Sequence, residues 1–162
     1  MPERDPRRLD ITATPGPNAL RHWRQAVPWW RALRNAAIIY VARLVPSMRL
    51  KNTLYRATGM RVAPGVSVGL MAMFDVFFPE LIAIGENSIV GYGALVLAHE
   101  FLIEEYRTGK VSIGRNVVIG ANATVLPGVR IGDGTIVSAG SLVNRDLPGG
   151  VLAGGVPARV IR

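Results

Sequence analysis

The feature that most constrains this chain is a run of aliphatic residues that recur at intervals of six. The run proceeds without a slip through Ile113, Ile119, Val125, Ile131, Val137 and Val143. The same frame appears upstream at Ile84, Val90 and Val96, and before them at Val62 and Val68. Ordinary strands joined by loops would instead alternate with period two inside runs of variable spacing. The constant interval therefore favours a repeat architecture built from these eleven hexads.

A six-residue repeat has a direct structural interpretation: each hexad forms a short strand followed by a tight turn, with its aliphatic side chain inward. Glycine often follows the aliphatic residue, as at Gly114, Gly120 and Gly132. Glycine lets the chain turn where a side chain would clash. Neighbouring coils would stack through backbone hydrogen bonds about 4.8 Å apart. One hexad cannot bury its own face, so we expect stability to come from stacking.

Two other segments precede the repeat, which we assign to residues 60–162. Residues 1–18 show no periodicity and are predicted to be a flexible tail. Residues 19–59 form a basic, aromatic segment with a helical pattern, in which Pro28 marks a break or a first turn. Ser47 can cap a second helix, and Gly59 stands where a C-terminal glycine is expected.

Charge and composition limit the classes of protein and site. The net charge is +8, but Met1 to Arg61 holds 12 Arg/Lys against 3 Asp/Glu, and the remaining residues hold 7 against 8. No motif that reads a nucleic-acid groove accompanies this charge, so we expect no nucleic-acid partner. The chain has no cysteine and two histidines, which excludes thiolate zinc sites and a three-histidine metal site within one chain.

The location of the protein and the role of its basic segment are predicted less directly. The longest apolar run has seven residues, against about 20 needed to span a bilayer. No secretory signal is visible, so we expect a cytoplasmic protein. The basic segment either caps the open end of the repeat or, through residues 20–58, makes a peripheral contact with the anionic inner face of a membrane.

Two stretches carry a family resemblance: VSIGRNVVIGANATVLPGVRIGDGTIVSAGSLVNRDL and the ending AGGVPARVIR. They resemble the hexapeptide-repeat acyltransferases, close to the maltose and galactoside O-acetyltransferases. The resemblance covers about Val62 to Arg162. It implies a mainly β fold, a left-handed parallel β-helix with three hexads per coil, to which the residue pattern adds the N-terminal α-helical segment. It further implies a homotrimer with active sites between subunits, and acetyl-CoA as co-substrate with no metal.

The repeat is interrupted at the point where this family carries its catalytic histidine. Seventeen residues separate Val96 from Ile113, and His99 stands at the root of this excursion, whose loop we assign to residues 100–112. Imidazole titrates near neutrality and suits a general base. The resemblance assigns the backbone N–H of Ala121 to the oxyanion. The alternative is a histidine that only packs at a corner.

Further positions follow from the resemblance alone. For coenzyme A they are Ala139, Asn144, Arg145, Arg159 and Arg162. An arginine suits phosphate because its guanidinium forms bidentate hydrogen bonds. The alternative for the last two arginines is a solvated chain end.

The acceptor side has weaker candidates. Asp75 is the nearest polar residue in the coil below His99, and it could bind an acceptor hydroxyl, pair with His99 or cap a turn. Glu100 opens an acidic cluster with Glu104 and Glu105 and is a second acceptor-binding candidate; a solvated loop face is the alternative.

Together these patterns predict a coenzyme A-dependent O-acyltransferase. It would transfer acetyl from acetyl-CoA to a hydroxyl of a small-molecule or glycan acceptor of carbohydrate type, with His99 as the base. With no cysteine in the chain and no serine beside His99, we expect direct transfer without an acyl-enzyme. Two alternatives stay open: an N-acyltransferase acting on an amino sugar or amine, and a non-catalytic trimeric scaffold.

Overall fold

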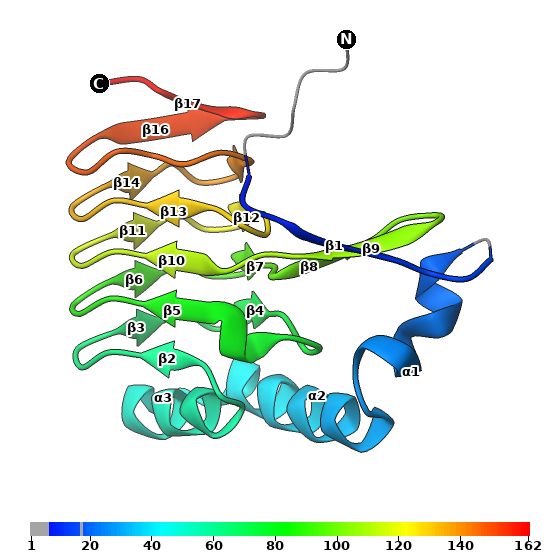
Figure 1. The fold of residues 1–162 in the computed structure, drawn as a ribbon. Coiled ribbons are helices and arrows are strands. Elements are labelled where there is room, and N and C mark those ends of the chain that lie inside the picture. The colour runs from blue at the N-terminus through cyan, green and yellow to red at the C-terminus, as the bar shows by residue number, and fades with distance from the viewer. Residues whose placement is uncertain (1–6, 17) are drawn as a thin grey trace, which may run out of the picture.

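The repeat forms three parallel sheets, which the chain visits in the same order in every turn (Figure 1). The computed structural model describes residues 7–16 and 18–162. Face 1 contains β2 (Arg61–Val62), β5 (Ile82–Ile84), β10 (Val111–Ile113) and β13 (Arg130–Ile131). Face 2 contains β3 (Ser67–Val68), β6 (Ile89–Val90), β11 (Val118–Ile119), β14 (Ile136–Val137), β16 (Leu152–Gly155) and the antiparallel β17 (Ala158–Val160). Face 3 contains β4 (Met73–Phe74), β7 (Leu95–Val96), β12 (Thr124–Val125) and β15 (Leu142–Val143).

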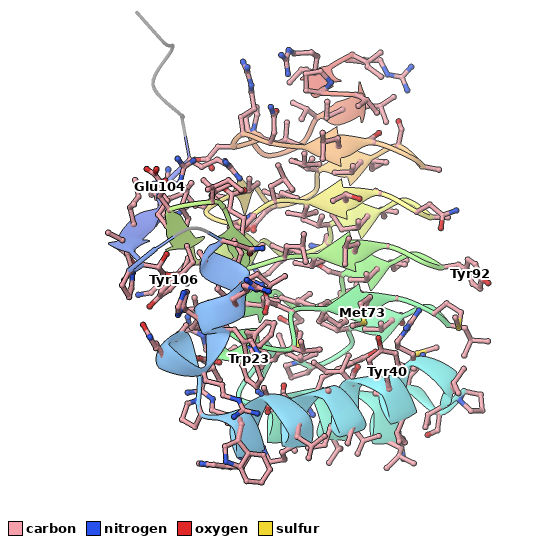
Figure 2. The ribbon with its side chains drawn as sticks, turned by 90° about the vertical axis from the view of Figure 1, so that its right-hand side faces the viewer. Trp23, Tyr40, Met73, Tyr92, Glu104 and Tyr106 are labelled. Carbon is pink, nitrogen blue, oxygen red and sulfur yellow. The ribbon has the colours of Figure 1, made fainter. Side chains whose placement is uncertain are left out.

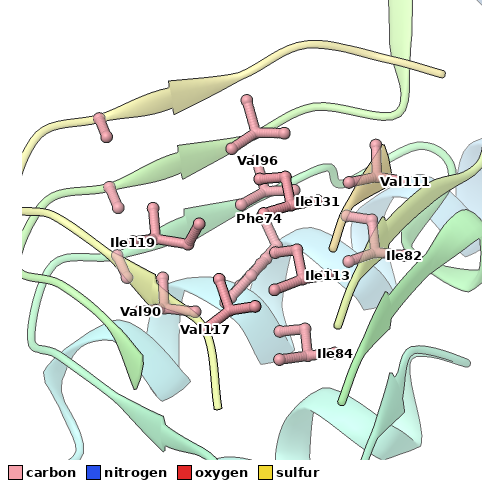
Figure 3. Close-up of a cluster of buried hydrophobic side chains, with 14 of the residues drawn as sticks. Phe74, Ile82, Ile84, Val90, Val96, Val111, Ile113, Val117, Ile119 and Ile131 are labelled. Atoms are coloured by element: carbon pink, nitrogen blue, oxygen red, sulfur yellow. The ribbon is translucent and has the colours of Figure 1, made fainter. Parts of the chain in front are cut away.

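The register of these sheets places equivalent hexad positions on top of one another. On face 2, Val68 pairs with Val90, and Ile119 pairs with Val90 and Val137. All eleven predicted aliphatic residues are buried. Figure 3 shows some of them gathered inside the coil: Ile84, Val90, Val96, Ile113, Ile119 and Ile131. Phe74 is a twelfth inward position, paired with Val96 on face 3 and also buried. The spacing of six did not reveal it, because an insertion follows its hexad.

Glycine after the inward residue is explained by the approach of the next coil. A Cβ built on Gly85 would lie 2.5 Å from the carbonyl carbon of Gly114, closer than real contacts allow. The same corner turns through left-handed backbone, with φ of 55° at Asn87 and 54° at Asn116. Asn and Gly adopt this conformation at the lowest cost.

Helices cap the open end of the coil, as Figure 1 shows for α2 and α3 below β2. The segment comprises η1 (Ala19–His22), α1 (Trp23–Ala26), α2 (Trp29–Leu44) and α3 (Met48–Ala57). Ser47 accepts a hydrogen bond from the Leu50 N–H at the start of α3, as predicted. Pro28 directly precedes α2, and Gly59 follows α3 with a φ of 99°.

Buried polar side chains on these helices satisfy carbonyls of the first coil, which has no coil below it. The Asn35 amide donates to Val76 O (3.2 Å), and the Asn52 amide donates to Val66 O (2.7 Å). The Lys51 ammonium donates to Val68 O at 3.1 Å, and burial lowers the pKa of this lysine. Unpaired backbone groups at a sheet edge are a liability that proteins cover.

Two segments differ from the sequence-based expectation. Within the predicted tail, Asp10–Ala13 forms β1, and the predicted loop 100–112 contains a hairpin of β8 (His99–Phe101) and β9 (Glu105–Thr108). β1 pairs antiparallel with β9, which gives a small sheet that projects from the coil. The partners lie almost a hundred residues apart, so no local periodicity signals the pairing. Residues 1–6 and 17 of the predicted tail lie outside the described residues.

The contact at Gly85 leads to a stability prediction. We expect Gly85→Ala to lower the free energy of unfolding by about 1–3 kcal/mol, because the methyl group has no room against the next coil. Gly134→Asn is the matched control. Gly134 lies at the same corner with a φ of 70°, and a Cβ there would come no closer than 3.9 Å to the next coil. The control should change stability by less than about 0.5 kcal/mol. Denaturant unfolding measures both, and equal losses would contradict the explanation.

Candidate active site

The candidate site is built from two insertions at one corner of the coil, where the chain passes from face 3 to face 1. We call this the histidine corner; it comprises residues 75–81 and 97–110. Ten residues separate Phe74 from Ile84, and seventeen separate Val96 from Ile113. The next coil passes the same corner with no extra residue. The two insertions come from consecutive coils, so stacking brings them into contact.

Asp75 and His99 meet at the start of these insertions. His99 Nδ1 lies 2.5 Å from Asp75 Oδ2. An ionised carboxylate can only accept, so Nδ1 carries the proton of this contact, and in the neutral imidazole Nε2 is then the acceptor nitrogen. Nε2 has no hydrogen-bond partner among residues 7–16 and 18–162. The His99 side chain keeps 13% of its surface exposed, whereas the Asp75 side chain is fully buried.

Backbone N–H groups donate hydrogen bonds to both oxygens of the Asp75 carboxylate. Oδ2 also accepts from the Ala98 N–H at 2.8 Å. Oδ1 accepts from the N–H groups of Phe77 and Phe78, each at 2.9 Å, which closes a turn. Asp75 therefore pairs with His99 and caps a turn, two of the three roles considered for it. These contacts occupy both oxygens of the buried carboxylate, and the predicted acceptor-binding role of Asp75 stays a prediction.

Aromatic rings surround the imidazole of His99. Phe77 and Phe101 contact it edge-on, with ring centroids 5.0 and 5.1 Å away. Phe78 lies at 5.7 Å and also stacks with Tyr106. Sequence reasoning missed this wall. The alternation of a strand that begins at His99 places Phe101 on the same side as the histidine, and that signal could have identified it.

Glu100 lies on the opposite side of β8 and does not join His99. The Arg7 guanidinium forms a bidentate pair with it, at 2.9 and 3.1 Å. Arg107 lies 3.6 Å away. The predicted acceptor-binding role of Glu100 stays a prediction, and in this structure its carboxylate is paired with arginines. Successive side chains of a strand point to opposite faces, so Glu100 and His99 cannot share one.

Ala121 and Ala139 lie at a different corner, where the chain passes from face 2 to face 3. We call this the alanine corner; it comprises residues 91–93, 120–122, 138–140 and 154–155. Gly140 N donates to Ala121 O at 2.8 Å, and Asn122 N donates to Tyr92 O at 2.8 Å. Figure 2 shows Tyr92 on the side of the molecule opposite Tyr106 in the hairpin. One chain therefore does not bring Ala121 to its own His99.

The remaining cofactor candidates divide between the two corners. Arg159 pairs with Gly154, which lies over Ser138 beside Ala139, and it is exposed. Asn144 and Arg145 follow β15 at the histidine corner. Arg145 is exposed, whereas Asn144 Oδ1 is buried without a hydrogen-bond partner among the described residues. Arg162, at the C-terminal end, is exposed.

Comparisons with known proteins agree with this architecture. Residues 110–145 match the family model described as bacterial transferase hexapeptide (six repeats). "Putative acetyltransferase YvoF" of Bacillus subtilis is 49% identical over 156 residues, covering 96% of this chain and 91% of that protein. "Putative acetyltransferase SAR0816" of Staphylococcus aureus is 42% identical over 141 residues, covering 86% of this chain and 88% of that protein.

Solved structures share the fold at low identity. A galactoside acetyltransferase in complex with coenzyme A superposes with a TM-score of 0.64 at 24% identity, covering 82% of this chain and 80% of that one. A maltose O-acetyltransferase from Clostridium difficile has a TM-score of 0.62 at 20% identity, covering 82% and 86%. The chain therefore belongs to the hexapeptide-repeat transferase family, and it is an acyltransferase.

The buried carboxylate leads to a second stability prediction. We expect Asp75→Ala to lower the free energy of unfolding by at least about 2 kcal/mol, because three backbone N–H groups lose their acceptor. Glu100→Ala removes a partly exposed ion pair and should cost no more than about 1 kcal/mol. Chemical denaturation measures both variants. A larger loss for Glu100→Ala than for Asp75→Ala would contradict this account.

Proposed function

We propose that this chain is a coenzyme A-dependent O-acyltransferase that moves an acetyl group from acetyl-CoA to a hydroxyl of a carbohydrate-like acceptor. The observation that carries the proposal is the pair formed by His99 and the buried Asp75. We further propose that the coil is a left-handed parallel β-helix with three hexads per turn, and that three copies assemble into a homotrimer.

His99 acts as the general base in this proposal. Nε2 takes the proton of the acceptor hydroxyl while the oxygen attacks the thioester carbonyl. The new C–O bond forms, the C–S bond breaks, and the proton returns from His99 to the departing thiolate. Asp75 holds the imidazole in the required tautomer and stabilises its charged form, as a carboxylate does for the base of a triad. Asp75 is thus a positioning residue.

The oxyanion donor comes from a second copy of the chain. The Ala121 N–H has no hydrogen-bond acceptor within the described part of its own chain, and it lies away from His99 of that chain. A backbone N–H aimed at the carbonyl oxygen stabilises the charge that develops there. The histidine corner of one protomer facing the alanine corner of its partner would complete the site, which supports an oligomer with shared sites.

The proposed coenzyme A contacts fit such a cleft. The small side chain of Ala139 leaves room for a narrow pantetheine chain, and the exposed Arg159 and Arg162 suit phosphate groups. Asn144 contributes a buried, unpartnered amide oxygen on the opposite corner, where a donor from the cofactor would satisfy it. Arg145 lies beside it as a further cation.

The side chains around His99 limit the kind of acceptor that this site can bind. Phe77, Phe78 and Phe101 present rings to His99, while Asp75 and Glu100 are engaged elsewhere. A ring with one apolar face, such as a sugar, suits an aromatic wall. An amine acceptor would use the same base.

The kinetic test uses release of free thiol from acetyl-CoA across a panel of sugars, amines and glycolipids. We expect turnover with a hydroxyl acceptor, and a loss of about 10²–10⁴-fold in kcat for His99→Ala. Asp75→Asn should lose activity to a similar order, because it no longer fixes the Nδ1–H tautomer.

His22, the second histidine of the chain, supplies the control. His22→Ala should keep its activity within a few-fold of the parent. Equal activity of the His99→Ala and parent proteins would remove His99 from the mechanism, and turnover with amines alone would shift the proposal to N-acylation.

Complementation tests the shared site. His99→Ala and Ala139→Leu should each be inactive alone, the first without a base and the second with a blocked cofactor groove. Mixed oligomers contain clefts in which an intact His99 faces an intact Ala139, so unfolding and refolding the two variants together should restore part of the activity. No recovery in hetero-oligomers verified by mass spectrometry would contradict a site between copies.

A further inference from the structure

The outer face of α2 is apolar and exposed to solvent. The inner face of this helix packs on the coil through Ala32, Asn35, Ile39 and Ala42. The opposite face is also apolar: Trp30, Leu33, Tyr40, Val41 and Leu44 are each more than half exposed. A surface helix usually keeps its outer face polar. Contiguous exposed apolar patches of this kind mark contact sites.

The positive charge around this face indicates which kind of partner it fits. Residues 18–61 contain eight arginines, one lysine and no acidic residue. Arginines accompany the exposed rings: the Arg34 guanidinium lies 5.9 Å from the Trp30 ring centroid, and that of Arg43 lies 5.3 Å from the Tyr40 centroid. A cationic face with tryptophan, tyrosine and aliphatic side chains is complementary to the headgroup region of an anionic bilayer.

A second copy of the chain fits this face less well. A two-fold pairing puts the same patch on both sides, so the arginines of one copy would oppose those of the other. The facing arginines would repel each other across the interface and so oppose association, unless anions lay between them. Within residues 7–16 and 18–162 no helix has the length and hydrophobicity to cross a bilayer, so the contact would lie in the plane of the membrane surface.

We propose that α2 docks this protein on an anionic membrane surface through the face defined by Trp30, Leu33, Tyr40, Val41 and Leu44, with the surrounding arginines on the lipid phosphates. The helix sits at the end of the coil away from the C-terminus (Figure 1). Docking there would leave both corners of the coil uncovered.

The face is continuous with the candidate active site. A groove of about 360 Å³ with an almost entirely apolar wall runs between α1, α2 and the first insertion. Trp29 and Leu33 line it on the α2 side, and Phe77 lines it on the other. Phe77 also contacts the His99 ring. If the proposed function holds, an acceptor with a lipid portion would place that portion in this groove, next to Phe77.

Vesicle binding tests the proposal without reference to activity. All three tryptophans of the chain, Trp23, Trp29 and Trp30, lie at this end, so intrinsic fluorescence reports directly on it. We expect a blue shift and co-sedimentation with phosphatidylcholine vesicles that contain phosphatidylglycerol. Pure phosphatidylcholine should give neither, and high salt should weaken both.

Matched variants locate the contact. Leu33→Gln with Val41→Gln should weaken binding about tenfold or more, since both side chains lose apolar contact with the bilayer. Arg24→Gln with Arg34→Gln should weaken it by a similar factor. Ile161→Gln is the control, because Ile161 is 63% exposed, as Leu33 is, but lies at the other end of the coil. It should bind as the parent does, and near-UV circular dichroism checks that each variant is folded.

Three results would overturn the proposal. One is absence of binding to anionic vesicles at low salt. Another is equal binding by the parent and the Leu33/Val41 variant. The third is a fall in the sedimentation coefficient of the free protein on substituting Leu33 and Val41, which would mean that a second copy covers the face. If the parent protein binds anionic vesicles but shows no transferase activity, that result would count against the proposed function alone.

Discussion

Backbone hydrogen bonding between successive coils is the constraint on which the rest of this structure depends. Val68, Val90, Ile119 and Val137 occupy one column because each pairs in register with its equivalent in the next coil. A shift of one residue in any coil would turn its inward side chains outward. The same stacking lets a glycine such as Gly85 lie against the backbone of the next coil, where a methyl group has no space.

Two features of the candidate site follow from this stacking. Consecutive coils are both lengthened at the histidine corner, so the turn that follows Phe74 lies directly below the hairpin that begins at His99. Asp75 needs no long reach to the imidazole because it occupies the equivalent corner one coil lower. The alanine corner is displaced around the coil, so the geometry that creates the histidine pair also separates it from Ala121 within one chain. This separation is the reason for proposing that a partner chain supplies the donor.

The sequence predicted the part of the fold that repeats and failed where contacts are non-local. Eleven inward positions followed from spacing alone, and the helix that begins after Ser47 followed from capping residues. Phe74 was missed because an insertion hides the end of its hexad. The pairing of Asp10–Ala13 with the hairpin has no local signature, since both strands are short and their partners lie far apart. Glu100 follows His99 in sequence but pairs with Arg7, because adjacent strand residues face opposite ways, and sequence proximity alone could not show this.

The placement of both insertions at one corner has a consequence for how such a chain can change. Residues added between the end of a face 3 strand and the start of the next face 1 strand leave every inward position in its column. The segments at the histidine corner can therefore be lengthened, shortened or replaced as a unit while the core keeps its register. Natural divergence in acceptor choice, and any attempt to redesign it by loop grafting, should concentrate there, whereas a single inserted residue within a strand would disturb the whole stack.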